Sequence, residues 1–159
     1  MPTMKTLVKL LLGVGALALA MPAAHAQREK LPPEDLAYVQ KTWPDAKKTS
    51  TGLRYVILKE GQGESPRPGS RVAVIYEGRL LEGKVFNKLD DRANPMVFRV
   101  RRGEVIEGWE QILQQMKVGE RRLVIIPSEL AYGTRGRPPD IARNATLVFE
   151  IELLEIRRD

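Results

Sequence analysis

Cysteine is absent from this 159-residue sequence, and histidine occurs once, at position 25. A chain without cysteine has neither a disulfide nor a thiolate nucleophile. His25 lies in an N-terminal segment that we expect to be removed, and the remainder then has no imidazole to transfer protons near neutral pH. These absences exclude Ser-His and Cys-His nucleophilic catalysis and the usual zinc ligand sets. We therefore expect no metal ion and no cofactor.

Basic residues outnumber acidic ones, 26 to 20, but the sequence contains no continuous basic stripe. The arginines occur in doublets interleaved with glutamates: Arg101-Arg102, Arg121-Arg122 and Arg157-Arg158. A nucleic-acid-binding surface needs clustered cations together with stacking aromatics or a recognition helix. The pattern instead indicates solvated strand faces, and we expect no nucleic-acid partner.

The first 26 residues have the three-part pattern of a signal peptide. Lys5 and Lys9 are followed by an apolar run over residues 10–20 and by small residues at Ala24 and Ala26. The run is short for a membrane span, and no cysteine follows that could carry a lipid. A retained anchor or a lipoprotein is therefore the less favoured alternative. The pattern predicts cleavage near Ala26 and a periplasmic or secreted bacterial protein with no stable membrane anchor.

Residues 27–50 form a charged, proline-marked segment, which we interpret as an N-terminal arm or linker. A partial apolar stripe predicts a short helix over residues 34–42. Pro44 ends it, because the residue before a proline disfavours helical backbone angles. Tyr38 and Trp43 dock either on the following domain or on a second chain, and the alternative is a loosely ordered linker. The sequence leaves open whether the protein is a monomer or a dimer.

Residues 51–159 combine strand patterns with a single helix. Alternating apolar residues predict strands over five stretches: 53–58, 72–81, 96–100, 123–126 and 147–153. In the last strand Glu150 and Glu152 are expected to point to solvent, and residues 87–95 are expected to form an irregular charged loop. Several antiparallel strands and one helix predict an α+β domain in which a twisted antiparallel β-sheet is wrapped around one short α-helix.

That helix follows Ile106 and carries four apolar residues on one face, at the spacing i, i+3, i+4 and i+7: Trp109, Ile112, Leu113 and Met116. We expect this face to be buried and Gly119 to take the left-handed conformation that closes a helix. An indole in so short a helix supplies a large flat wall. The pattern therefore predicts a hydrophobic pocket at the N-terminal end of the helix.

Aromatic and large apolar residues at turn positions extend this predicted pocket. Phe86 follows a turn, Tyr132 lies in a Tyr-Gly turn, and Val105 and Ile106 precede the helix. A single apolar residue is usually part of the core, but aromatics in turns and loops are typical of pocket walls. The candidates for the pocket are Tyr76, Phe86, Met96, Val105, Ile106, Trp109, Tyr132 and Phe149.

Four segments of the chain resemble the FKBP-type peptidyl-prolyl cis-trans isomerases in order and spacing: VIYEGRLLEGKVF, EVIEGWEQILQQMKVGERR, IPSELAYG and ATLVFEIELLEI. The lead-in TSTGLRYVILKEGQG is similar to the exported bacterial members. The resemblance implies faster X-Pro isomerisation during the folding of exported proteins. It also implies proline-containing or unfolded polypeptides as substrates and a macrolide such as FK506 as inhibitor.

The resemblance also implies the roles of individual residues. Trp109 forms the floor beneath the proline ring, while the backbone N–H of Ile106 and the hydroxyl of Tyr132 hold carbonyls of the bound peptide. Ile141 closes one side of the pocket. The implied catalytic residues are Tyr76, Phe86, Asn87, Trp109, Tyr132 and Phe149, and the implied substrate-binding residues are Met96, Val105, Ile106 and Ile141.

Four positions depart from the family's pattern. Asn87 stands in place of an aspartate and has no negative charge, and Met96 replaces an aromatic wall residue. Arg137 and Asp140 bring charge into the loop beside the pocket. These departures leave two hypotheses for the pocket: an isomerase, and a weakly active or inactive peptide-binding or chaperone module. A third hypothesis is a structural protein whose arm, residues 27–50, docks on another subunit.

Overall fold

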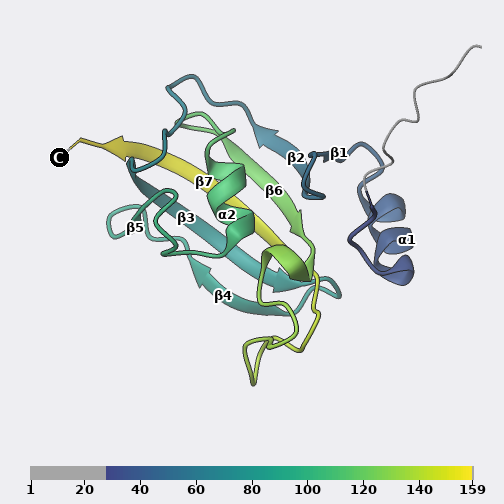
Figure 1. Ribbon diagram of the computed structural model, residues 1–159. Helices are drawn as coiled ribbons and strands as arrows, with labels where there is room; N and C mark the ends of the chain where they lie inside the picture. Colours follow the sequence, from purple (N-terminus) through teal and green to yellow (C-terminus); the bar gives the residue numbers. More distant parts are fainter. Residues whose placement is uncertain (1–27, 159) are drawn as a thin grey trace, which may run out of the picture.

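The computed structural model describes residues 28–158, so the predicted signal peptide, residues 1–26, lies outside the described part of the chain. Figure 1 shows one twisted sheet with helix α2 against one face and helix α1 at one end. The elements in chain order are α1 Pro33–Thr42, β1 Lys47–Lys48, β2 Arg54–Lys59, β3 Arg71–Leu80, β4 Val85–Leu89, β5 Met96–Arg99, α2 Glu107–Leu113, β6 Arg121–Ile126, the 3₁₀ helix η1 Ser128–Leu130 and β7 Leu147–Arg157.

The seven strands form a single antiparallel sheet in the order β1-β2-β6-β7-β3-β4. The long strand β3 has two further neighbours on its outer edge. Its first half pairs with β5 and its second half with β4. This split opens the edge of the sheet between β4 and β5, next to the N-terminal end of α2 (Figure 1). The predicted α+β architecture is confirmed.

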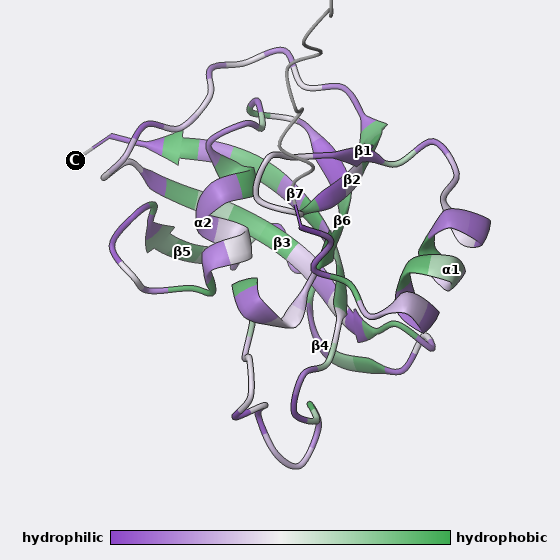
Figure 2. Ribbon diagram, turned by 45° about the vertical axis from the view of Figure 1, so that its right-hand side comes forward, coloured by the Kyte–Doolittle hydropathy of each residue, from purple (hydrophilic) through white to green (hydrophobic). Residues whose placement is uncertain are grey.

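Residues 123–126 of β6 and 147–149 of β7 are apolar on both faces because both faces are covered there. Successive residues of a strand point to opposite sides, and here one set packs under α2 and the other under α1. The set under α2 includes Val124, Ile126, Leu147 and Phe149. The set near α1 comprises Leu123, Ile125 and Val148, which pack with Leu31 and Val39 of the arm. Figure 2 shows the apolar side of α1 turned toward the sheet.

Helix α2 buries the face that the sequence predicts. Trp109 is 4% exposed, and Ile112, Leu113 and Met116 are fully buried. The helix ends at Leu113, however, so Met116 lies in the turn beyond it. Gly119 has a φ of +87°, the left-handed conformation expected for it. It closes the turn before β6 and does not directly cap the helix.

Two expectations about the strands are wrong. Residues 87–89 belong to strand β4, because they pair with residues 76–78 of β3, so the predicted irregular loop begins later. Glu152 is 7% exposed and does not point freely to solvent. Arg92 and Lys59 cover it, with ion pairs of 2.7 and 3.7 Å to its carboxylate. A carboxylate paired in this way can be buried on a strand face.

The arm packs on its own domain. Helix α1 begins at Pro33 and ends at Thr42, close to the predicted 34–42, and Trp43 is half-buried against the cluster beneath it. Tyr38 remains 44% exposed, so of the two aromatic residues only Trp43 docks on the domain of its own chain. The two-residue strand β1 also joins the arm to β2, a pairing that the sequence analysis missed. Within residues 28–158, no helix combines the length and hydropathy needed to cross a membrane.

Candidate active site

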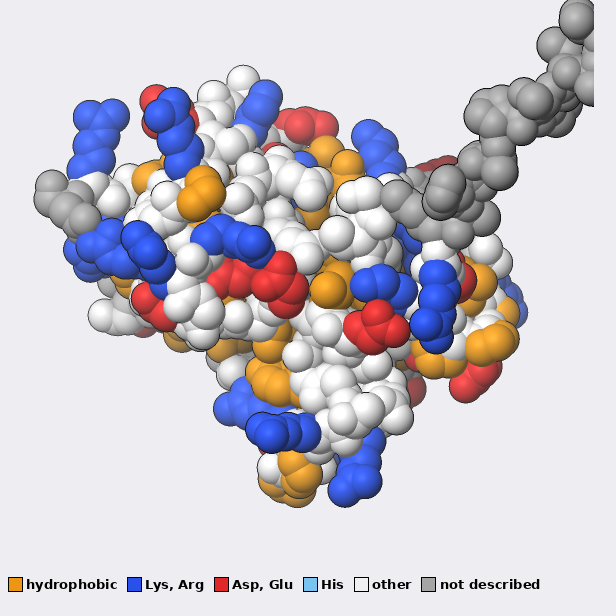
Figure 3. All heavy atoms as spheres, in the orientation of Figure 1, with side chains coloured by type: hydrophobic (Ala, Val, Ile, Leu, Met, Phe, Trp, Pro, Cys, Tyr) orange, Lys and Arg blue, Asp and Glu red, His pale blue; other side chains and the backbone are white. Residues whose placement is uncertain are grey.

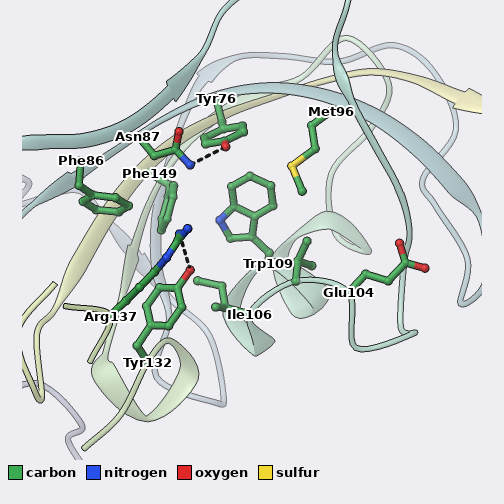
Figure 4. A pocket seen from close by; sticks show the side chains of 11 residues that line it. Tyr76, Phe86, Asn87, Met96, Glu104, Ile106, Trp109, Tyr132, Arg137 and Phe149 are labelled. Carbon is green, nitrogen blue, oxygen red and sulfur yellow. Dashed lines mark hydrogen bonds between the residues drawn. The ribbon is translucent and has the colours of Figure 1, made fainter. Parts of the chain in front are cut away.

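An open cavity of about 280 Å³ lies at the N-terminal end of α2, where the sequence predicts a pocket. This volume is near the lower end of ligand pockets, roughly 300–1,000 Å³. Nine of the ten predicted site residues line it (Figure 4). The complete lining is Tyr76, Phe86, Asn87, Met96, Glu104, Val105, Ile106, Trp109, Tyr132, Arg137 and Phe149.

Trp109 lies at the bottom of the cavity with rings around it. Its ring centroid is 4.9 Å from that of Tyr76 and 5.3 Å from that of Phe149, at interplanar angles of 79° and 84°. Edge-to-face contacts of this kind are favourable for aromatic pairs and fix the orientation of the indole. Within residues 28–158, the buried Nε1–H of Trp109 has no hydrogen-bond acceptor. The floor is therefore rigid and apolar, with one unused donor.

Phe86 and Asn87 both reach the cavity because strand β4 contains a bulge. Neighbouring residues of a regular strand point to opposite faces. Here Asn87 pairs with Gly78 and Val85 with Arg79, so Phe86 is left without a partner. A bulge re-aims the side chains around it, and the Phe86 ring stands 5.6 Å from that of Phe149 at 86°.

Gly78 on β3 gives these two rings their space. A Cβ atom at this position would lie 2.5 Å from Cε1 of Phe149 and 2.8 Å from Cζ of Phe86. Real Cβ atoms do not approach neighbours so closely, and any side chain here would displace the rings. The glycine is therefore required by the wall of the cavity.

Asn87 and Tyr76 form a polar pair at the rim. The Nδ2 atom of Asn87 donates a hydrogen bond of 2.9 Å to the hydroxyl oxygen of Tyr76. Burial raises the pKa of the Tyr76 hydroxyl, and the bond from Asn87 only partly offsets this effect. Tyr76 therefore stays protonated at neutral pH, and its hydroxyl faces the cavity (Figure 4).

Two hydrogen-bond donors were predicted to hold peptide carbonyls, the backbone N–H of Ile106 and the hydroxyl of Tyr132. Ile106 is the N-cap residue of α2, with φ −60° and ψ 151°, and its backbone N–H donates no hydrogen bond within the described chain. Tyr132 follows η1, and its hydroxyl lies inside the cavity (Figure 4). Since the first N–H groups of a helix have no partner within it, the position of Ile106 makes this donor available.

Two charged residues at the rim of the cavity, Arg137 and Glu104, were not among the predicted site residues. Arg137 lies with its guanidinium 5.9 Å from the centre of the Tyr132 ring. Glu104 lines the cavity and was missed, because it has no special place in the motif that contains it. The buried carboxylate of Glu110 fixes this segment by accepting hydrogen bonds from the backbone N–H groups of Arg101 and Gly103.

Ile141 is the predicted site residue that does not line the cavity. It is 1% exposed and belongs to the core cluster under α2. It reaches that position because its backbone pairs with Arg137 in both directions, with N···O distances of 2.8 and 3.0 Å. Ile141 thus holds the loop against the core, and Arg137 is the member of the pair that reaches the cavity. Asp140 does not line the cavity either.

This arrangement has few chemical options. The cavity offers an aromatic floor, aromatic walls and several hydrogen-bond donors. It has no imidazole or thiol, and its one carboxylate, Glu104, lies at the rim (Figure 4). Such a site suits a compact apolar ring flanked by carbonyl groups, and its lining residues include no histidine or lysine that could act as a base beside a hydroxyl.

Comparison with known proteins points to the same chemistry. Residues 62–154 match the family of FKBP-type peptidyl-prolyl cis-trans isomerases. FK506-binding protein 4 of Rhizopus delemar is 46% identical over 110 residues, which cover 69% of this chain and 28% of the relative. The FKBP-type peptidyl-prolyl cis-trans isomerase FkpA of Escherichia coli is 42% identical over 111 residues, which cover 70% of this chain and 40% of the relative.

The match to a solved structure extends over a whole chain. The crystal structure of a peptidyl-prolyl cis-trans isomerase from Pseudomonas syringae superimposes with a TM-score of 0.69 at 33% identity, covering 82% of this chain and 100% of that one. By contrast, the chain spans less than half the length of the Rhizopus and Escherichia relatives. The family match covers more than half of the sequence and the motifs that build the cavity. The chain belongs to the family of FKBP-type peptidyl-prolyl cis-trans isomerases.

Proposed function

We propose that this chain is a peptidyl-prolyl cis-trans isomerase that binds the proline of an X-Pro bond on Trp109. The observation that supports this most directly is the cavity itself. Its aromatic floor is fixed by three neighbouring rings, and two carbonyl-binding donors, the Ile106 N–H and the Tyr132 hydroxyl, stand at its sides. Relatives at 46% and 42% identity over this domain support the same activity.

The mechanism follows from the physics of the imide bond. Resonance keeps X-Pro planar, and rotation crosses a barrier of roughly 20 kcal/mol. The planar form is more polar than the twisted one, so an apolar, water-poor cavity disfavours the planar form relative to the twisted form. Donors that hold the flanking carbonyls while the ring stays on Trp109 fit the twisted geometry best. Lowering the barrier by about 4 kcal/mol would accelerate rotation roughly a thousandfold.

The substrates we propose are proline-containing or unfolded polypeptides, with an FK506-like macrolide as inhibitor. Three of the relatives are named as FK506-binding proteins, and the cavity has the apolar lining that such a ligand needs. We further propose that the chain is exported and acts on exported proteins as they fold. This part of the proposal is supported by the leader pattern in residues 1–26, with its basic start, apolar run and small residues near Ala26.

A refolding assay tests the proposal. Addition of the chain should accelerate the proline-limited phase of a test protein, and FK506 should abolish the acceleration. The double variant Tyr132→Phe, Phe86→Ala should lose most of the activity, because it removes one carbonyl donor and one aromatic wall. If this variant retained both activity and inhibitor binding, the cavity would not be the active site.

A second candidate function is peptide binding without turnover. Asn87 favours it, because the rim has an amide where the family's pattern has a carboxylate. This alternative predicts measurable peptide binding by calorimetry together with background rates of isomerisation. Activity well above background, sensitive to FK506, would exclude it.

A further inference from the structure

Two opposite charges stand at opposite ends of the cavity, and neither is neutralised. Arg137 lies beside Tyr132 at one end, and Glu104 lies beyond Ile106 at the other (Figure 4). Arg137 contacts the Tyr132 hydroxyl at 3.5 Å, and the Glu104 carboxylate accepts a bond of 3.3 Å from the backbone N–H of Arg99. Among the described residues neither side chain takes part in an ion pair, although thirteen such pairs join other residues of this part of the chain.

The surroundings strengthen the charge at the Arg137 end. The loop between η1 and β7 also contains Arg135 and Arg143. Figure 3 shows basic side chains on several sides of the lobe that this loop forms at the bottom of the view. At the other end Glu104 follows a segment fixed by the buried carboxylate of Glu110, so its backbone is held in place. The cavity therefore has a positively charged end at Arg137 and a negatively charged end at Glu104.

The two predicted carbonyl donors differ in mobility, and this difference would set the direction of a bound peptide. The carbonyl that rotates belongs to the residue before proline, and a side-chain hydroxyl such as that of Tyr132 can turn to follow it. The carbonyl of proline itself does not rotate, and the fixed backbone N–H of Ile106 suits it. The residue before proline then lies near Arg137, and the residue after proline lies near Glu104.

We propose that the cavity selects X-Pro-Y segments in which X is acidic and Y is basic, with Arg137 and Glu104 as the residues that determine this preference. The inference rests on the proposed binding of proline on Trp109. Both side chains are exposed, so each contributes the modest, salt-sensitive attraction of a surface ion pair. Two such contacts acting together, against two repulsions in the reversed order, should separate the two peptides about tenfold in kcat/KM at low salt.

Three peptides of equal length test this: Ala-Glu-Pro-Lys, the reversed Ala-Lys-Pro-Glu and the neutral Ala-Gln-Pro-Gln. We expect the first to be isomerised about tenfold faster than the second, with the neutral peptide between them. The ratio of the two rates should fall toward one in 1 M NaCl, where the screening length is about 3 Å. Equal rates for the two charged peptides at low salt, or a difference that persists in 1 M NaCl, would overturn the inference.

Charge-reversed variants assign the preference to the two residues. The double variant Glu104→Lys, Arg137→Glu should reverse the order of the charged peptides, and Glu104→Gln, Arg137→Gln should abolish the preference. Arg135→Glu is the matched control, because it makes the same charge change in the same loop at a residue that does not line the cavity. It should keep the wild-type order with a smaller ratio, since Arg135 adds to the charge of the loop without reaching the cavity. A wild-type order in the reversed double variant would refute the assignment.

The neutral peptide separates this inference from the proposed function. If the wild-type chain turns over the neutral peptide but does not distinguish the charged ones, the isomerase proposal survives and the charge preference is refuted. If no peptide is turned over, calorimetric binding of the same three peptides decides. The expected affinity order is then acidic-first, neutral, basic-first, and equal affinities would reject the preference.

Discussion

The side-chain amide of Asn87 donates a hydrogen bond of 2.9 Å to the hydroxyl oxygen of Tyr76 at the rim of the cavity. An aspartate at this position could only accept from the tyrosine, so the direction of the bond would be reversed. The residue at position 87 therefore determines both the orientation of the Tyr76 proton and whether a negative charge stands beside it. Its effect on catalysis can be measured by a single substitution.

We predict that Asn87→Asp raises kcat/KM for a neutral peptide by about threefold to tenfold, which corresponds to roughly 1 kcal/mol. A carboxylate beside the rotating bond would stabilise the carbonyl carbon, which becomes more electropositive when resonance is lost. The control is Asn87→Ala, which leaves the Tyr76 hydroxyl without a partner and should not raise the rate. A fall in kcat/KM on Asn87→Asp, with the fold intact, would contradict the argument.

Gly78 provides a second test, because it makes room for the aromatic wall. We predict that Gly78→Ala lowers inhibitor affinity and kcat/KM by at least tenfold and destabilises the fold by about 1–3 kcal/mol, the usual cost of overpacking. The cause is the clash of the new methyl group with Phe149 and Phe86. Fluorescence titration with FK506 and urea denaturation measure the two effects.

The control for Gly78 is Gly83→Ala in the β3–β4 turn. Gly83 has a φ of +104°, and a Cβ there would meet no atom within 4 Å. The substitution should therefore cost about 1 kcal/mol through backbone strain alone and leave the cavity unchanged. If both variants lost activity in proportion to their loss of stability, the wall would not depend on Gly78.

The aromatic floor was predictable from the sequence because two local signals coincide. The spacing of Trp109, Ile112 and Leu113 fixes the buried face of α2, and this pattern involves no long-range contact. The turn positions of Phe86 and Tyr132 mark them as wall residues for the same local reason. The resemblance to a family then added Asn87, which no periodicity singles out.

The remaining features depend on contacts between distant segments. The bulge that brings both Phe86 and Asn87 to the cavity arises from the register of β4 on β3, and the sequence showed a loop there instead. Glu152 is buried because Arg92, 60 positions away, covers it. Ile141 lies in the core and Arg137 reaches the cavity because the two residues are paired through their backbones. Register and long-range pairing are not encoded in a local pattern, so sequence reasoning missed these features.

The ion-pair cluster at Glu29 makes stability depend on acid. Its carboxylate accepts hydrogen bonds of 3.1 and 2.7 Å from Arg54 and one of 2.9 Å from Lys48. The Arg54 guanidinium holds the pKa of this carboxyl well below its usual range. A group whose folded pKa is depressed stabilises the fold above its unfolded pKa, about 4.3 for glutamate, and this stabilisation is lost as the pH falls through and below that value.

We therefore predict that the free energy of unfolding falls more steeply in the wild type than in Glu29→Gln as the pH is lowered from about 6 to about 3. The two proteins should differ most near neutral pH and converge in acid. Urea denaturation at a series of pH values measures both curves. Parallel curves would show that the Glu29 cluster contributes nothing to the docking of the arm.

A hydrogen bond of 2.6 Å from the Thr146 hydroxyl to the Asp35 carboxylate joins the arm to the loop beside the cavity. Thr146 is 4% exposed and stands at the end of the loop that contains Tyr132 and Arg137. On the other side of this loop, Lys30 contacts Glu129 of η1 at 3.2 Å. The arm thus holds both ends of the loop, and the Asp35 bond is the more buried of the two contacts.

A double-mutant cycle with Asp35→Ala and Thr146→Val measures this link. A charge-assisted hydrogen bond contributes about 1.5–3 kcal/mol, so each single variant should lose at least about 1 kcal/mol of unfolding free energy. The double variant should lose about 1 kcal/mol less than the sum of the two single losses, because once one partner is gone, removing the other breaks no further hydrogen bond. The matched cycle with Lys30→Ala and Glu129→Ala should show weaker coupling, since that pair is more exposed. Full additivity in the first cycle would mean that α1 and the loop are adjacent without being coupled.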